Sequence, residues 1–130
     1  MKRLLKTVLV VIVVIFVVAL FLPTLLRHKE TIPEITFRLR TVAFALKQYH
    51  GNFGTYPTGT WQEASHVLMG ENPKQHVFIN MARWTNTIGE LVDPWGTPFS
   101  FSIETNMILR SAGPNRIFGD KDDVVHAEQY

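Results

Sequence analysis

The feature that most constrains this chain is an uninterrupted apolar run near its N-terminus. From Val8 to Leu22 no side chain is polar, and the run reaches Leu26 with only Pro23 and Thr24 interrupting it. The 19 residues from Val8 to Leu26 would span about 28 Å as an α-helix, close to the hydrocarbon thickness of a bilayer. No small-residue cleavage site follows the run, which favours an uncleaved transmembrane helix over a secretory signal.

Basic residues on both sides of the apolar run predict its orientation. Three stand before it, at Lys2, Arg3 and Lys6. Two stand after it, at Arg27 and Lys29. By the positive-inside rule, this excess places the N-terminus in the cytoplasm. We therefore expect residues 1–29 to form a cytoplasmic tip and a single-pass anchor in the inner (cytoplasmic) membrane. The head, residues 30–130, would then be periplasmic.

Charge and composition exclude several classes of function. The chain has 130 residues and a formal net charge of +2, and outside the N-terminal tip ten basic residues are balanced by eleven acidic ones. This balance predicts no nucleic-acid partner. The absence of cysteine excludes disulfides and thiol catalysis. The sequence contains neither a His-Glu-x-x-His motif nor a Gly-x-Ser-x-Gly elbow, and we expect no enzymatic activity.

A second stretch, residues 34–50, has the pattern of an amphipathic helix. Its apolar residues recur at helical spacing, at Ile35, Leu39, Val42, Leu46 and Tyr49. We expect this helix to be the main core element of the head, with Arg38 and Arg40 on its solvated side. The same stripe would also suit a short seam to a second subunit, although it covers only two heptads.

Residues 51–92 are predicted to be variable loops with little regular structure. A short helix is expected from Trp61 to Met69, because Trp61, Ala64, Val67 and Leu68 have helical spacing. Val77 to Ile79 could form a short strand, and Met81 to Gly89 shows no period.

Residues 93–124 are predicted to hold a small antiparallel sheet and an acidic loop. Asp93-Pro94-Trp95-Gly96 begins a dense turn, in which the Asp93 side chain would accept hydrogen bonds from backbone amides. The alternation from Phe99 to Ile103 predicts a half-buried strand, and Met107 to Arg110 the returning strand. Of the three tryptophans, Trp95 is expected to be the first to be buried.

Five segments together resemble the type IV pilin-like proteins, and specifically the major pseudopilins of type II secretion. In chain order they are Val10 to Leu26 with Pro23, then Tyr49, Asn52, Gly54 and Tyr56-Pro57, then Asp93-Pro94-Trp95-Gly96-Thr97-Pro98-Phe99, then Ser111-Ala112-Gly113-Pro114-Asn115, and Gly119-Asp120-Lys121-Asp122-Asp123-Val124. The resemblance implies an α+β, pilin-like fold. In it a long N-terminal helix, half transmembrane and half amphipathic, packs on a small antiparallel sheet that ends in a calcium-type loop.

The acidic loop is the candidate metal site. Calcium prefers six to eight oxygen ligands on a bent backbone, and Asn115, Asp120, Asp122 and Asp123 lie within nine residues of one another. The resemblance implies Ca²⁺ bound by the side chains of Asn115, Asp122 and Asp123, with Asp120 as a further candidate. It also implies backbone ligands at Leu109, Ser111 and Ala112. The competing interpretation is a solvated acidic turn, with His126 in an exposed tail.

The resemblance also implies a function and a set of partners. The chain would be a structural subunit of a type II secretion or type IV pilus-like assembly that contributes to protein secretion. Its partners would be the membrane, other pseudopilin-like subunits including copies of itself, and the inner-membrane platform of the secretion system. The alternative is a stand-alone, membrane-anchored binding or accessory protein with the same fold. No glycine precedes Gly51, and Lys6 stands near the family's acidic position, so the prepilin cleavage motif is absent.

Overall fold

The computed structural model describes residues 11–19 and 32–129. The chain divides into two units, Met1–Thr31 and Ile32–Tyr130. In the first unit residues 11–19 are helical and exposed, and the rest of the predicted span from Val8 to Leu26 lies outside the described residues. Within the described part, no helix combines the length and the apolar character of a candidate membrane span.

The main element of the second unit is α2 (Ile32–Phe53), which confirms the helix predicted for residues 34–50 and extends it at both ends. Ile35, Leu39, Val42 and Leu46 are all at most 1% exposed. Tyr49 packs against the edge of this cluster. The helical spacing therefore identified the buried face of α2 correctly.

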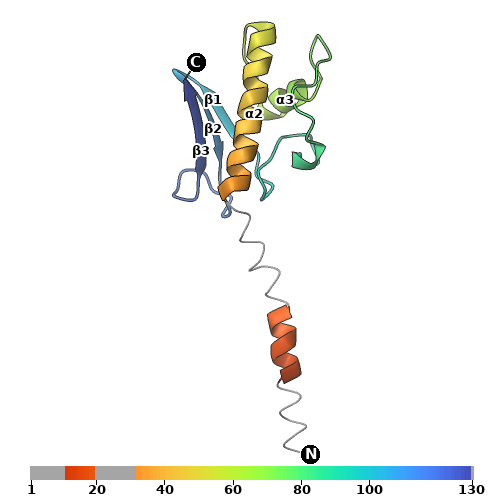
Figure 1. Ribbon diagram of the computed structural model, residues 1–130, viewed down its shortest axis with the longest axis vertical. Helices are drawn as coiled ribbons and strands as arrows, with labels where there is room; N and C mark the ends of the chain where they lie inside the picture. The colour runs from red at the N-terminus through yellow and green to blue at the C-terminus, as the bar shows by residue number, and fades with distance from the viewer. Residues whose placement is uncertain (1–10, 20–31, 130) are drawn as a thin grey trace, which may run out of the picture. The chain divides into compact units, whose positions relative to one another are not determined.

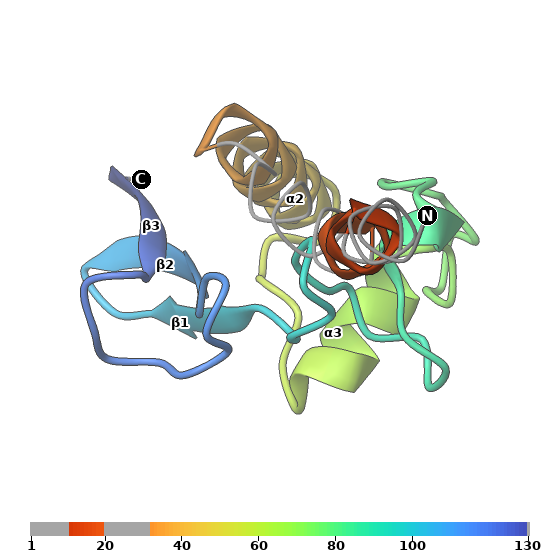
Figure 2. The ribbon, with the colours of Figure 1, turned by 90° about the horizontal axis from the view of Figure 1, so that it is seen from below.

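A three-stranded antiparallel sheet packs against α2. Its order is β1 (Ser100–Ile103), β2 (Asn106–Ser111) and β3 (Val124–Gln129). In the register Ser100 pairs with Arg110, and Ser111 pairs with Val124. Figure 2 shows the sheet on one side of α2 and α3 on the other. The molecule is thus α+β with a small antiparallel sheet, as expected.

Strand β3 was missed, and His126 is not in an exposed tail. The more buried positions of β3 are Val124, His126 and Glu128. The last two are polar, so the segment lacks the alternation of apolar and polar residues that predicts a strand. Glu128 is contacted from two sides: Lys47 Nζ on α2 lies 2.9 Å from Glu128 Oε2, and His126 Nε2 lies 3.4 Å from Glu128 Oε1. Inward-pointing charges of this kind also protect an edge strand from pairing with other chains.

The short helix α3 (Trp61–Leu68) confirms the second helical prediction. Its N-cap Thr60 accepts a hydrogen bond from the Glu63 amide, and the Glu63 side chain accepts one from the Thr60 amide. This reciprocal capping box satisfies two amides at the start of the helix. The hydrogen bonds from Thr60 also lower the pKa of Glu63.

The strand predicted for Val77 to Ile79 is wrong. The amides of Phe78 and Ile79 instead both donate to the Leu68 carbonyl at the end of α3, at 2.9 and 3.1 Å. This segment therefore closes the C-terminus of a helix, where carbonyl groups lack intrahelical partners.

The predicted order of tryptophan burial is also wrong. Trp84, in a 3₁₀ turn at Ala82–Trp84, is 4% exposed, whereas Trp95 is only partly buried at the edge of the core. Trp84 is buried because its loop folds back against α2, where Phe37 meets its ring edge-to-face at 6.0 Å. Figure 1 shows this loop on the α3 side of α2.

Candidate functional site

The turn that precedes the sheet is built around Asp93. This residue is 1% exposed, and its Oδ1 accepts hydrogen bonds from the amides of Trp95 (3.0 Å) and Thr97 (2.8 Å). The Gly96 amide also donates to the Asp93 carbonyl at 3.0 Å. These contacts confirm the turn predicted for Asp93, Pro94, Trp95 and Gly96, including the role of the carboxylate.

The same carboxylate connects this turn to the start of the acidic loop. The Ser111 hydroxyl donates to Asp93 Oδ2 at 2.7 Å, and the Gly113 amide donates to Ser111 Oγ at 3.1 Å. Asp93 and Ser111 are both buried, so this chain of bonds is shielded from water. Two segments 18 residues apart are thereby held together through one side chain.

Glycine is required where the loop closes. Gly113 has φ = +69°, and a Cβ there would clash with the backbone oxygen of Asp122. The two ends of the loop are therefore in direct backbone contact. No other amino acid adopts this conformation at this spacing without displacing the loop.

Two of the predicted ligands pair with each other. Asn115 Nδ2 donates to Asp120 Oδ2, and Asn115 Oδ1 accepts from the Ile117 amide at 2.9 Å. Asp120 Oδ1 accepts from the Asp122 amide at 2.8 Å. These bonds shape the loop around its own backbone, as is typical of Asx turns.

Asp123 has the environment that best fits a cation. Its side chain is 5% exposed, and its Oδ2 accepts from the Gly119 amide at 2.8 Å and lies 3.3 Å from Arg110 Nη1. Its Oδ1 is buried without a hydrogen-bond partner among the described residues. A buried carboxylate oxygen with no donor is costly, and a bound cation would remove that cost.

The predicted backbone ligands lie on or just after β2, whose Ser111 pairs with Val124, the residue that follows Asp123. Leu109 and Ser111 belong to β2, and Ala112 follows directly; all three are buried. Within the described part of the chain, no three His, Cys, Asp or Glu side chains converge as a metal-binding group. A calcium ion here would depend on Asp123, Asp122 and the amide and backbone oxygens. That donor set has the all-oxygen chemistry calcium prefers.

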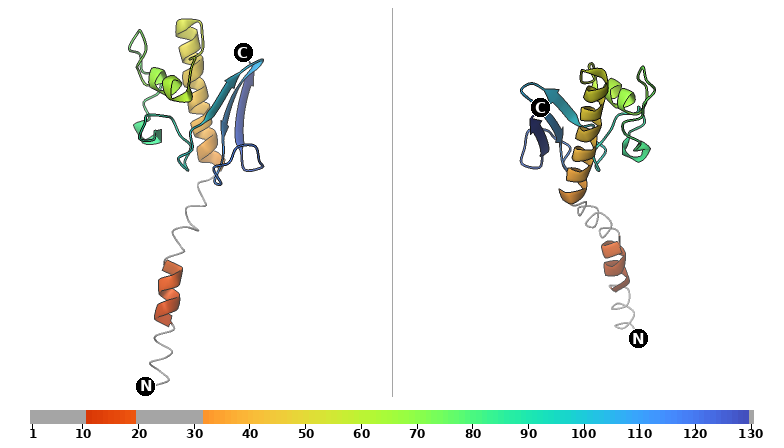
Figure 3. Two further views of the ribbon diagram at one scale, coloured as in Figure 1. Left: turned by 180° about the vertical axis from the view of Figure 1, so that it is seen from behind. Right: turned by 45° about the horizontal axis from the view of Figure 1, so that its top comes forward.

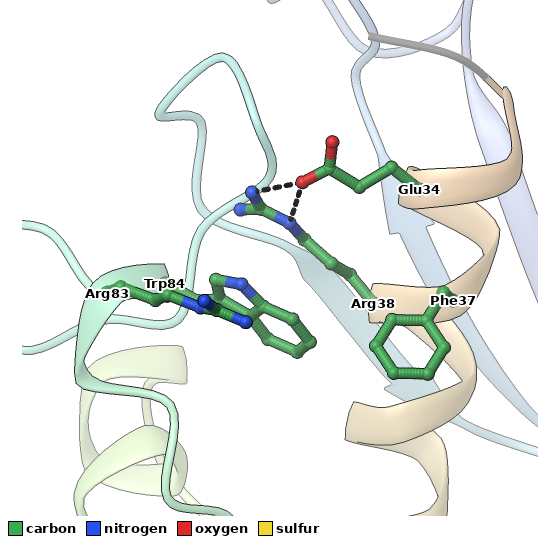
Figure 4. A pocket seen from close by; sticks show the side chains of 5 residues that line it. All are labelled: Glu34, Phe37, Arg38, Arg83 and Trp84. Atoms are coloured by element: carbon green, nitrogen blue, oxygen red, sulfur yellow. Dashed lines mark hydrogen bonds and ion pairs between the residues drawn. The ribbon is translucent and has the colours of Figure 1, made fainter.

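A recess beside α2 was not anticipated from the sequence. It has a volume of about 400 Å³ and is lined by Glu34, Phe37, Arg38, Arg83 and Trp84. As Figure 4 shows, Arg38 binds Glu34 through Nη2 (2.6 Å) and Nε (3.2 Å). Its guanidinium also lies 5.0 Å from the centre of the Trp84 ring. Arg38 was expected on a solvated face, but its side chain is only 12% exposed.

His66 joins α3 to the loop that follows it. Its Nε2 lies 3.1 Å from the Ile88 carbonyl oxygen, and its Nδ1 lies 3.0 Å from Glu71 Oε1. Both neighbours accept hydrogen bonds, so both contacts are satisfied together only by the doubly protonated ring. The Ile88 carbonyl, followed by the Glu71 carboxylate, raises the pKa of His66.

Comparison with known proteins identifies no relative. No family model, curated protein or solved structure matches the chain.

Proposed function

We propose that this protein is a non-enzymatic, pseudopilin-like structural subunit of a type II secretion or type IV pilus-like system. Residues 1–29 anchor it in the inner membrane with the N-terminus in the cytoplasm, and the head lies in the periplasm. Its partners are the membrane, neighbouring subunits of its own kind and the secretion platform. The family-like segments in chain order support this proposal, together with an α+β head in which a long helix packs on an antiparallel sheet.

The observation that best supports the proposal is the contrast between the two faces of α2. One face is fully buried against the sheet, whereas Phe37 and Phe44 on the other are 57% and 62% exposed. The exposed segment at residues 11–19 is also apolar throughout. A chain that combines an apolar N-terminal segment with exposed aromatic residues on its main helix suits side-by-side packing of subunits.

The proposal predicts that the apolar segments of neighbouring chains lie in contact within the membrane. The chain has no cysteine, so introduced cysteines are unique. Val13→Cys and Ile15→Cys in one chain point to nearly opposite sides of a helix, about 200° apart. Oxidation in membranes should then give a ladder of oligomers beyond the dimer.

Two results decide the outcome of this crosslinking experiment. Ile15→Cys alone should stop at the dimer, because one thiol forms one disulfide, and this variant is the matched control. If the double variant stays monomeric at native expression, the subunit does not assemble and the proposal fails.

Calcium is the second part of the proposal, with the role of stiffening the C-terminal loop so that heads dock. At ten times Kd, calcium would stabilise the head by about 1.4 kcal/mol. Thermal unfolding with calcium and with a chelator measures this directly. Asp122→Ala and Asp123→Ala should abolish the calcium response. If wild-type unfolding ignores both calcium and chelator, the loop binds no calcium.

The alternative, a stand-alone membrane-anchored binding or accessory protein, is favoured by one sequence observation. Lys6 and the missing glycine before Gly51 remove the motif used for prepilin cleavage in the family. Mass spectrometry of the N-terminus in membranes separates the two proposals. A start at Met1 or Lys2 together with no crosslinked ladder supports the stand-alone protein, whereas a ladder supports the structural subunit.

A further inference from the structure

The tip of the C-terminal loop exposes two large apolar side chains. Ile117 is 63% exposed and Phe118 is 42% exposed. Asp120, also exposed, lies two residues further along. We call residues 117–120 the knob. An apolar pair at a loop tip beside a carboxylate is typical of a contact surface rather than of a solvated turn.

The knob is held rigidly by hydrogen bonds from the loop backbone. The Arg116 amide donates to the Gly113 carbonyl at 3.2 Å. The Ile117 amide donates to Asn115 Oδ1 at 2.9 Å, and the Gly119 amide donates to Asp123 Oδ2 at 2.8 Å. A pre-ordered loop loses less conformational entropy on binding than a flexible one. The apolar pair is therefore presented by a loop whose backbone is already hydrogen-bonded.

The recess beside α2 has complementary properties. Its wall contains the exposed Phe37 ring and the Trp84 indole, and its volume of about 400 Å³ is at the small end of the range for binding pockets. Arg38 is already neutralised by Glu34. Arg83 is exposed and has no carboxylate partner among the described residues of the chain. Because Trp84 is 4% exposed, the recess offers one exposed aromatic ring, that of Phe37, and one unused cation.

The knob and the recess face opposite sides of the head. Figures 1 and 3 place the C-terminal loop on the sheet side of α2 and the Ala82–Trp84 turn on the α3 side. Glu34 and Phe37 lie in the first turns of α2, and the loop lies near the same end of the helix (Figure 1). A knob and a socket on opposite sides form a head-to-tail contact, which generates rings or open filaments.

We propose that the knob of one copy of this chain packs into the recess of the next copy, with Asp120 facing Arg83. The inference rests on the proposed assembly and specifies which head surfaces meet in it. It accounts for the exposure of Ile117 and Phe118 on one side, and on the other for an arginine that has no carboxylate partner in the described part of the chain.

A mixed-cysteine experiment on the full chain in membranes tests this contact. One population carries Lys121→Cys, next to the knob, and the other carries Ala82→Cys, next to Arg83; both positions are exposed, and the side chains proposed to make the contact stay in place. A short bis-maleimide linker should give dimers when the populations are co-expressed and none with either population alone. That asymmetry separates a head-to-tail contact from a two-fold one, in which identical surfaces meet.

A control variant shows whether the crosslink depends on the recess. Val77→Cys, which is half exposed, replaces Ala82→Cys as the matched control and should give at least tenfold less dimer. The docking is overturned if the control crosslinks equally, or if either variant crosslinks with itself as strongly as the mixture does. The Val13→Cys/Ile15→Cys ladder separates the two failures. A ladder without knob–recess crosslinks leaves assembly standing and removes the docking, whereas no ladder removes both.

Discussion

The α2–sheet interface and the hydrogen-bond network around Asp93 are both buried, but different forces hold them. The interface is made of apolar side chains at helical and strand spacing, such as Leu39 of α2 and Leu109 of β2, which belong to one core cluster. The Asp93 network is held by a few polar atoms: Oδ1 fixes the turn at residues 93–97, and Oδ2 binds Ser111 at the start of the C-terminal loop. Apolar packing is spread over many contacts, whereas the polar network depends on single groups whose loss leaves buried partners unsatisfied.

The sharpest test of this difference is Asp93→Ala. It would leave the Ser111 hydroxyl and the amides of Trp95 and Thr97 without their acceptor, and we expect a loss of about 4 kcal/mol. Urea unfolding of the detergent-solubilised full chain, followed by tryptophan fluorescence, measures it. Asp120→Ala is the control, because it removes an exposed carboxylate that also accepts two hydrogen bonds; water can replace those bonds, so the loss should be about 1 kcal/mol. Equal effects of the two changes would show that burial of Asp93 is irrelevant.

Leu39→Ala tests the apolar interface at a fully buried position. The cavity and the lost transfer free energy should cost about 3 kcal/mol, measured by the same unfolding experiment. Phe44→Ala on the exposed face of α2 is the comparison and should change stability by about 0.5 kcal/mol or less. A large effect of Phe44→Ala in monomeric protein would mean that this face packs within the chain.

Gly113→Ala tests the closure of the loop. The left-handed backbone and the close Asp122 oxygen should together cost about 2 kcal/mol. Gly96→Ala is matched in backbone conformation at φ = +85° but has open space around it, so its cost should be about 1 kcal/mol. If the two variants unfold alike, the contact with Asp122 contributes nothing.

The smallest expected effect concerns His66, which lies outside both regions. Its pKa is raised by the Ile88 carbonyl and the Glu71 carboxylate, so its contribution to stability is complete below the usual histidine pKa of 6.5. The contribution is lost as the pH rises through the higher pKa of the folded state. The difference in melting temperature between wild type and His66→Gln should therefore be largest near pH 5.5 and absent near about pH 8.5. A difference that grows with pH would contradict the raised pKa, and an NMR titration of the ring measures that pKa directly.

Local patterns predicted the elements whose burial follows a simple period. The spacing in α2, the alternation around Phe101 in β1 and the turn at Asp93 were all read from neighbouring residues, and the structure confirms them. Strand β3 was missed because its inward positions carry His126 and Glu128. Its strand conformation is set by pairing with β2 and by Lys47 from α2, and neither partner is visible in the segment itself.

In the C-terminal loop, too, some features could be predicted from the local sequence and others could not. Its acidic composition and its bends were evident from the sequence, so a calcium site could be predicted, and it remains a prediction. The sequence did not indicate that Asn115 pairs with Asp120, or that Asp123 keeps one oxygen buried without a donor. Such details depend on distances between atoms that the chain brings together only when it folds.

By itself, the sequence determined an apolar N-terminal segment, a helix with one buried face and an α+β head that ends in an acidic loop. These follow from hydrophobic periodicity and turn chemistry, which act over a few residues. Only the tertiary structure decided that Trp84 is buried rather than Trp95, that Asp93 holds Ser111, and that a knob and a recess face opposite sides of α2. Each of these joins segments distant in the chain, and such contacts depend on how the elements pack rather than on local spacing.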